Sequence, residues 1–140
     1  MLLTASLTCL ALNIYFEARS EDLVSKIAVA QVTLNRVHSE KYPDTVCEVV
    51  TQKDQFSWYW DGKSDKPRER AAWRKSLALA EAILDHPETI RIDCVSNATH
   101  YHASYVSPKW SKTFTKNCKV GKHIFYTNTI PRIKPRLRGT

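Results

Sequence analysis

The chain has 140 residues, a net charge of +7, 43% hydrophobic residues and only three glycines. That length favours one domain with a proper hydrophobic core, and the composition excludes a disordered or collagen-like chain. Residues 1–93 contain all fourteen acidic residues and twelve Lys and Arg, whereas residues 94–140 contain nine Lys and Arg and no acidic residue. A basic half of this kind points to a polyanionic partner, and a nucleic acid, an anionic membrane and a charged wall polymer all fit that description.

Helical periodicity dominates the first forty residues. Apolar residues three and four apart predict a helix over residues 5–18 and a second helix that continues to about His38. Ser20 is the expected N-cap of the second helix, with Glu21 and Asp22 in its first turn, where acidic side chains interact favourably with the helix dipole. Both helices would present an apolar face to the core.

Two further helices are expected before residue 86. Asp44 is the expected cap of a short helix over residues 45–51. A loop or short strand over residues 54–67 follows, with Gly and Pro as breakers. Apolar periodicity then predicts a helix over residues 69–85, which a proline follows.

The last third of the chain has the pattern of strands. Aromatic and β-branched residues predict short strands over residues 101–106 and 122–127. We therefore expect a single α+β domain over residues 1–129, mainly helical, with a small antiparallel sheet in its C-terminal half. Residues 130–140 contain two prolines and four positive charges, and are expected to form a basic, solvated tail.

The N-terminus is apolar without being a signal peptide. Residues 1–14 lack a basic leading region and run without a cleavage site into the first helix, so we interpret them as part of the domain. No apolar run approaches the ~20 residues that span a bilayer, so no transmembrane segment is expected.

The sequence alone does not decide whether the four cysteines are free thiols or form disulfides. None of their spacings gives a CxxC pair, which argues against a structural zinc site. Buried free thiols and three disulfide connectivities are all compatible with the cysteines alone.

Glu17 is the first candidate for catalysis. It lies near the end of the first helix among aromatic and apolar neighbours, where burial would raise the carboxyl pKa and let it hold a proton near neutral pH. A general acid that protonates a leaving oxygen needs that property. The alternative is a surface glutamate paired with Arg19 or Lys26. Glu21, four residues on, is interpreted as part of a helix N-terminus rather than as a second catalytic carboxylate.

His100 and His102 form a second constellation. On a strand, the two rings of a His-x-His stretch would lie on one face, as they do in some metal sites. With His38 or His123 and a carboxylate, they would make the zinc centre of a peptidoglycan amidase or peptidase. No early His–Asp signature completes such a site, so we favour structural hydrogen bonding and expect neither a metal nor another cofactor.

Aromatic side chains beside polar groups are a third feature. They offer faces on which sugar rings stack while amides and hydroxyls bind the sugar hydroxyls. The residues concerned are Gln55, Phe56, Ser57, Trp58, Trp110, Phe125 and Tyr126. Phe56 and Phe125 are interpreted as core residues. Interleaved lysines would also let these aromatics stack nucleobases, but no nucleic-acid-binding motif supports that partner.

Together these segments resemble a known family. The chain resembles the SleB-type cell-wall hydrolases, which include spore-cortex-lytic enzymes of germination and many phage and prophage endolysins. The resemblance covers about residues 8–127 and is specific in its combination of stretches, at residues 14–21, 27–37, 42–50, 55–58, 98–102 and 121–126.

The resemblance implies a lysozyme-like fold, similar to the catalytic domains of lytic transglycosylases. It implies cleavage of the β-1,4 bond between N-acetylmuramic acid and N-acetylglucosamine in peptidoglycan, with Glu17 at the position of the family's catalytic acid. Ser20 departs from the family pattern, in which glycine is commoner, but removes no catalytic group. Because these 140 residues include no wall-binding repeat before the domain, we expect a compact endolysin to be the closer analogue.

The sequence offers no second carboxylate to match Glu17, which favours the lytic-transglycosylase route, in which one carboxylate acts first as acid and then as base and leaves a 1,6-anhydro end. The hydrolytic muramidase route normally uses a second carboxylate. We expect the groove to contain Gln55, Phe56, Ser57, Trp58, His100, Tyr101 and Tyr126. A non-catalytic wall-binding module is the alternative from another class.

The same resemblance also implies which partner the protein binds and where it acts. We expect a monomer that acts on peptidoglycan at the bacterial cell wall, with holin-type release as a plausible route there. Its basic C-terminal third would bind anionic envelope polymers, not nucleic acid. Work outside the reducing cytosol favours disulfides, with Cys94–Cys118 around the sheet and Cys9–Cys47 between the first and third helices.

Overall fold

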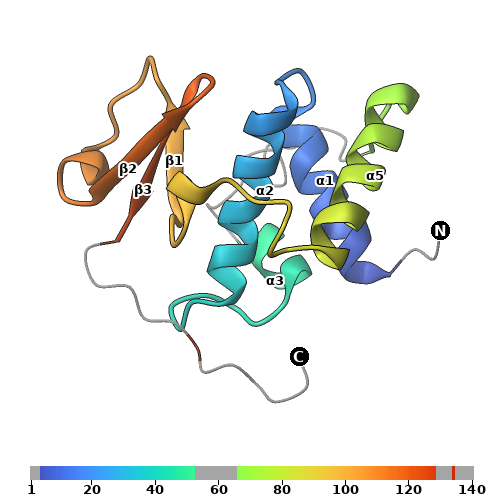
Figure 1. The fold of residues 1–140 in the computed structure, drawn as a ribbon, viewed down its shortest axis with the longest axis horizontal. Helices are drawn as coiled ribbons and strands as arrows, with labels where there is room; N and C mark the ends of the chain where they lie inside the picture. The colour runs from blue at the N-terminus through green and yellow to red at the C-terminus, as the bar shows by residue number, and fades with distance from the viewer. Residues whose placement is uncertain (1–3, 53–65, 129–133, 135–140) are drawn as a thin grey trace.

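The computed structural model describes residues 4–52, 66–128 and 134. Within these ranges a group of α-helices packs beside a three-stranded antiparallel sheet (Figure 1), which confirms the predicted α+β class and the place of the sheet in the C-terminal half. None of the helices described is long and apolar enough to cross a membrane.

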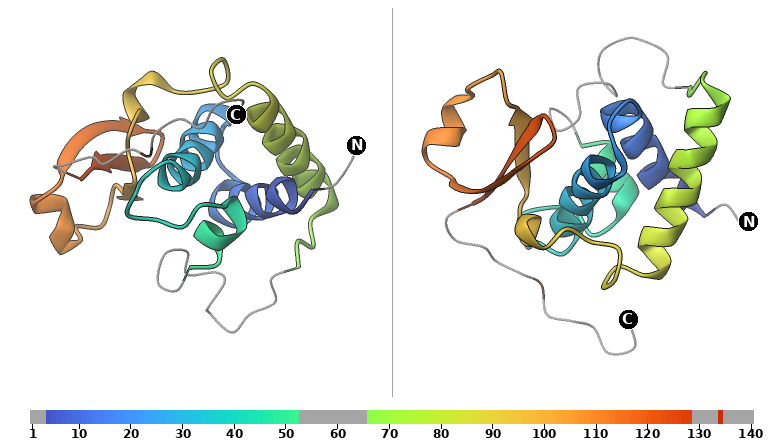
Figure 2. Two further views of the ribbon diagram at one scale, coloured as in Figure 1. Left: turned by 90° about the horizontal axis from the view of Figure 1, so that it is seen from below. Right: turned by 45° about the horizontal axis from the view of Figure 1, so that its top comes forward.

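Helix α2 (Leu23–Val37) lies between the other helices and the sheet. Figures 1 and 2 show it between the sheet and helix α1 (Ala5–Ala18). One side of α2 contributes Ala30 to a core shared with the other helices, and another side contributes Val29 and Val32 to a core shared with the sheet. A helix that is apolar on two sides can separate two cores, as α2 does.

The helical core forms where α1 meets α3 (Val46–Val50) and α5 (Arg70–Asp85). Helix α5 is amphipathic, and its apolar stripe packs on α1 while its other face is exposed. Between α1 and α2, the Thr33 hydroxyl donates a 2.7 Å hydrogen bond to Asn13 Oδ1 within this buried contact. The bond satisfies the Thr33 hydroxyl and the Asn13 carbonyl oxygen, which water does not reach.

The sheet has strand order β1-β3-β2, with all pairs antiparallel. Its strands are β1 (His100–Ala103), β2 (Thr115–Val120) and β3 (His123–Thr127). Because side chains alternate along a strand, Tyr101 and its partner Phe125 face α2, whereas His100 and its partner Tyr126 face away from it. Phe125 is fully buried, as predicted.

Two short 3-10 helices complete the sheet region. Helix η1 (Asp93–Val95) leads into β1, and η2 (Lys109–Lys112) lies between β1 and β2. A bulge in β2 between Lys116 and Cys118 turns the side chain of Asn117 toward η1, where its amide donates to the carbonyl oxygens of Cys94 and Ser96.

Both disulfides that the resemblance implied are present. Cys9–Cys47 joins α1 to α3, and Cys94–Cys118 joins η1 to β2. Each bond closes a long segment of chain, so each restricts the unfolded ensemble and stabilises the fold.

The start of two helices differs from the sequence prediction. Asp22, not Ser20, is the N-cap of α2, and its carboxylate accepts the Ser25 amide at 2.9 Å. Thr45, not Asp44, caps α3, because its hydroxyl oxygen accepts the Glu48 amide and its hydroxyl group donates to the Glu48 carboxylate.

The strands also differ from prediction. The first and last are shorter than the expected 101–106 and 122–127, and β2 was not predicted. Strand β2 lies at the edge of the sheet, and its lysines interrupt the apolar alternation that identifies a strand.

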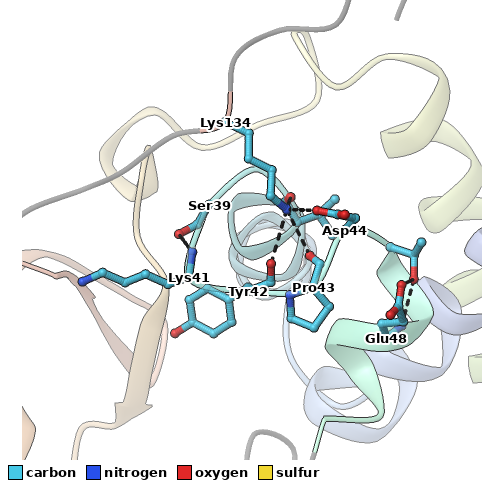
Figure 3. A network of polar contacts seen from close by, with 9 residues as sticks. Ser39, Lys41, Tyr42, Pro43, Asp44, Glu48 and Lys134 are labelled. Atoms are coloured by element: carbon cyan, nitrogen blue, oxygen red, sulfur yellow. Dashed lines mark hydrogen bonds and ion pairs between the residues drawn. The ribbon is translucent and has the colours of Figure 1, made fainter.

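The expected solvated tail is wrong at Lys134. This residue is partly buried, and Figure 3 shows its ammonium group among carbonyl oxygens of the segment that follows α2. Its physical reason is the set of unpaired carbonyls at the end of α2, which attract a positive charge.

Gly121 in the β2–β3 turn has a positive φ of 56°, and a Cβ there would lie 2.3 Å from the Ser25 hydroxyl oxygen. We expect Gly121→Ala to lower the free energy of unfolding by about 1–3 kcal/mol, because it adds strain and a contact with α2. Chemical denaturation measures this loss. The exposed neighbour provides the control, since Lys122→Ala should change stability little; equal effects of both variants would contradict the prediction.

Candidate active site

Glu17 lies in the last turn of α1, and its side chain points toward β1. The Tyr101 hydroxyl donates a 2.5 Å hydrogen bond to Glu17 Oε1. The two residues are 84 positions apart in sequence, so the fold and not local structure brings them together. This bond is the direct polar link between the last turn of α1 and the sheet.

The pKa of the Glu17 carboxyl lies above its ordinary value of 4.5. Burial is the largest cause, since it disfavours the charged form. The hydrogen bond from Tyr101 and the charge of Arg36 lower the pKa, but less than burial raises it. A carboxyl in this environment is suited to hold a proton and deliver it as a general acid.

Tyr101 remains protonated at this site. Burial, the Glu17 charge and the shared hydrogen bond raise the pKa of its hydroxyl well above the ordinary value of 10.0. The hydroxyl is therefore a donor to Glu17 Oε1 at any physiological pH, which leaves Oε2 as the oxygen that can carry a transferable proton.

Arg36 is the functional residue that the sequence analysis missed. It is a buried residue of α2 whose Nε donates a 2.8 Å hydrogen bond to the Thr99 carbonyl oxygen, directly before β1. Its charge acts on both Glu17 and Tyr101. The sequence does contain an indication of its burial, because Arg36 follows Ser25, Val29 and Val32 at helical spacing on a buried side of α2.

The alternative role for Glu17, a surface ion pair, does not occur here. Arg19 instead pairs with Glu69 at 3.2 Å and lies over the Tyr15 ring. The Tyr15 hydroxyl accepts the amides of Arg68 and Glu69 at the start of α5. These contacts fix the end of α1 against α5 and so fix the backbone that carries Glu17.

Glu21 lies beyond the end of α1 and outside α2, contrary to its expected place in the first turn of that helix. Its carboxylate is 3.7 Å from His123 Nδ1, and both side chains are mostly buried. The His123 ring meets the Tyr101 ring edge to face, with centroids 5.2 Å apart. Glu21 and His123 therefore lie next to the Glu17–Tyr101 pair, on the same side of the sheet.

His100 and His102 share one strand face, as predicted, but it is the face opposite Tyr101. Both rings pack against Trp110, with centroids 5.0 and 5.6 Å away. His102 Nδ1 donates to the Ala103 carbonyl oxygen at 2.7 Å, and its Nε2 is hydrogen-bonded to the Tyr126 hydroxyl at 2.9 Å. Burial lowers the pKa of His100 to about 4, with help from the charges of Arg36 and Lys41.

The predicted groove residues fall into three places. Gln55, Phe56, Ser57 and Trp58 lie outside the described residues. Tyr101 is on the Glu17 side of the sheet, and His100 and Tyr126 are on the other side. Over residues 4–52, 66–128 and 134, no three His, Cys, Asp or Glu side chains are grouped so as to hold a metal ion.

Comparison with known proteins places the chain in a family. A model of the cell wall hydrolase family matches residues 20–126, a stretch that begins just after Glu17. The chain belongs to the cell wall hydrolase family. Among solved members, the catalytic domain of the germination-specific lytic transglycosylase SleB from Bacillus anthracis is 30% identical, with a TM-score of 0.69 over 90% of this chain and 97% of that one.

Other family members give the same picture. The catalytic domain of the Bacillus cereus SleB protein has a TM-score of 0.64 and 28% identity, over 89% of this chain and 91% of that one. The spore cortex-lytic enzymes of Bacillus cereus and Oceanobacillus iheyensis are 34% and 33% identical over 80% of this chain. The chain spans 40% and 38% of the length of these two relatives. The predicted SleB-like fold is thus confirmed.

The raised pKa of Glu17 has a consequence for stability. A carboxyl whose pKa is higher in the folded than in the unfolded state destabilises the fold as pH rises above its unfolded value. We therefore expect the free energy of unfolding of Glu17→Gln, relative to that of the wild type, to increase from pH 4 to pH 7. The amide oxygen of the glutamine still accepts the hydrogen bond from Tyr101. Urea unfolding at both pH values measures the difference.

The control for this experiment is the exposed Glu88, whose replacement by Gln removes the same charge from the surface. Glu88→Gln should follow the wild type at both pH values. A Glu17→Gln variant that loses stability relative to the wild type as pH rises would contradict the prediction.

Proposed function

We propose that this chain is a peptidoglycan-degrading glycosidase that cleaves the β-1,4 bond between N-acetylmuramic acid and N-acetylglucosamine as a lytic transglycosylase. Glu17 is its catalytic acid. The observation that carries the proposal is a buried carboxyl with a raised pKa, held by Tyr101, in a chain that covers 97% of the catalytic domain of a lytic transglycosylase.

One carboxyl can serve both steps of this reaction. Glu17 Oε2 gives its proton to the glycosidic oxygen, and the N-acetylglucosamine side leaves with a free 4-hydroxyl as the bond to the muramic acid C1 breaks. The resulting carboxylate accepts the proton of the muramic acid C6 hydroxyl, whose oxygen bonds to C1. The products are a 1,6-anhydro end and a reprotonated Glu17, with no water consumed.

The hydrogen bond from Tyr101 serves this cycle in both protonation states. It satisfies Oε1 whether Glu17 is acid or carboxylate, so the proton leaves from and returns to the same oxygen. Arg36 stabilises the carboxylate form through its charge. The two residues thus keep the cost of deprotonation from rising too far for a group that must act as a base in the second step.

We expect Glu17→Gln to reduce release of soluble muropeptides from purified peptidoglycan by about 100-fold or more, since an amide cannot donate and recover the proton. Glu88→Gln is the matched control and should retain wild-type activity. Turbidity loss and chromatography of the products measure both. A folded Glu17→Gln variant with full activity would remove Glu17 from the mechanism.

Mass spectrometry of the muropeptides separates the two routes in the same experiment. Transglycosylation leaves 1,6-anhydro-muramic acid ends. Reducing muramic acid ends would show hydrolysis instead, in which a second carboxylate such as Glu21 assists a water. Binding to wall material without any product would show a non-catalytic module.

The remaining sequence predictions belong to the same proposal. We propose that residues 1–129 form the catalytic unit, which acts as a monomer at the bacterial cell wall after holin-type release. The groove is proposed to include Tyr101 and, from outside the described residues or from the other face of the sheet, the polar and aromatic side chains Gln55, Phe56, Ser57, Trp58, His100 and Tyr126.

The basic surface of the sheet region is proposed to bind anionic envelope polymers. Five exposed lysines lie on η2, on β2 and in the β2–β3 turn: Lys109, Lys112, Lys116, Lys119 and Lys122. Residues 94–140 contain no acidic residue to neutralise them. Carboxylates and phosphates of the envelope supply the complementary charge, and salt would screen the contact.

Replacing Lys112, Lys116 and Lys119 together by Gln should weaken co-sedimentation with cell walls about 10-fold at low salt and hardly at all at high salt. A control variant removes three exposed positive charges from α5 instead, at Arg70, Arg74 and Lys75. Equal losses in the two variants would show that only net charge matters, and would contradict a binding surface on the sheet region.

A further inference from the structure

Lys134 occupies a polar site at the end of α2. Its ammonium Nζ donates to the carbonyl oxygens of Val37 at 2.7 Å and of Tyr42 and Pro43 at 3.3 Å. The Asp44 carboxylate lies 2.5 Å from the same nitrogen (Figure 3). The Lys134 backbone amide also donates to the His38 carbonyl oxygen at 2.8 Å.

These contacts have a clear electrostatic basis. The last carbonyls of a helix have no partner within the helix and carry its partial negative charge. The three donors of the ammonium group are shared among these four acceptors, of which the Asp44 carboxylate and the Val37 carbonyl oxygen are nearest. Lys134 thus joins the end of α2 to the segment that connects it to α3, and Asp44 offsets its charge.

That connecting segment also holds Tyr42, which lies next to Arg36. The Arg36 guanidinium lies over the Tyr42 ring, 5.2 Å from its centroid, so the ring limits where the guanidinium can sit. Arg36 is in turn bonded to the Thr99 carbonyl oxygen and acts on Glu17. A continuous series of contacts therefore runs from Lys134 through Tyr42 and Arg36 to the Thr99 carbonyl, two residues before Tyr101, whose hydroxyl bonds Glu17.

We propose that Lys134 is a positioning residue for the active site: it fixes the segment after α2, so that Tyr42 keeps the Arg36 guanidinium on the Thr99 carbonyl, directly before the strand that carries Tyr101. The inference rests on the proposed function only in treating Glu17 as the acid. It gives the basic end of the chain a role within the fold at this position, in addition to any attraction to anionic polymers.

The titratable and charged groups that act on Glu17 are Tyr101 from β1 and Arg36 from α2. Because Arg36 lowers the pKa of Glu17, displacement of its guanidinium should raise that pKa. The effect is measured on the full-length chain by NMR titration of ¹³C-labelled glutamate carboxyls, with Glu17→Gln to identify the resonance. This readout requires no turnover, so it remains valid if the enzymatic proposal fails.

We expect Lys134→Met to raise the pKa of Glu17 by about half a unit or more. Tyr42→Leu should raise it in the same way, because it removes the intermediate contact. Lys75→Met removes one exposed positive charge from α5 and should leave the pKa unchanged. A folded Lys134→Met protein with an unchanged Glu17 pKa would overturn the proposal, even if its unfolding midpoint falls, because Lys134 would then have only a structural role.

Asp44→Asn provides a milder variant if Lys134→Met does not fold. Asp44 is largely exposed, and its carboxylate forms an ion pair with Lys134 Nζ, so removing the charge weakens the attachment of Lys134 to the segment after α2 without removing the lysine. Loss of a negative charge would by itself lower the pKa of Glu17, so an upward shift in Asp44→Asn would report displacement of Arg36. A downward shift or no shift would overturn the proposal.

Discussion

The hydrogen bond between Tyr101 and Glu17 joins the helical part of the molecule to the sheet, and much of the fold serves to keep it buried. Glu17 ends α1, which α5 holds through the Tyr15 hydroxyl and the Arg19–Glu69 pair. Tyr101 belongs to β1, whose approach to α2 is fixed by Arg36 and the Thr99 carbonyl. A carboxyl that must hold a proton needs this burial, and burial of a carboxyl costs stability unless neighbours offset it.

The two faces of the sheet carry different sets of side chains. On the side facing α2, Tyr101 meets Glu17, Phe125 and His123. On the other side, the two histidines of β1 pack with Trp110 and Tyr126. This difference follows from the alternation of side chains along a strand. The two histidines of the His-x-His stretch pack among aromatic rings on one face, and Tyr101 between them faces the other side and bonds Glu17.

Local signals identified much of the fold. The apolar stripes of α1 and α5 predicted both helices to within a residue, because each packs one face on a core. The caps of α2 and α3 were harder to predict, since Ser20, Asp22, Asp44 and Thr45 are all residue types that serve as N-caps. Strand β2 escaped prediction because an edge strand carries lysines where an inner strand carries apolar residues.

The active site was predictable only in part. A helix glutamate among aromatic residues could equally be a surface residue, and it was the resemblance to a family that favoured Glu17 as the acid. Arg36, in contrast, could have been found from the sequence, since it is a charged residue in phase with the buried side of α2. The partner of Glu17 could not, because Tyr101 lies 84 residues away and only the packing of β1 against the helices brings them together.

The most direct test of these conclusions is a crystal structure of the Glu17→Gln variant with a bound peptidoglycan oligosaccharide. The structure predicts a glycosidic oxygen within hydrogen-bonding distance of one side-chain atom of residue 17, with the Tyr101 hydroxyl still bonded to the other. A glycan bound instead against His100 and Trp110, with residue 17 remote from every glycosidic bond, would contradict Glu17 as the catalytic acid.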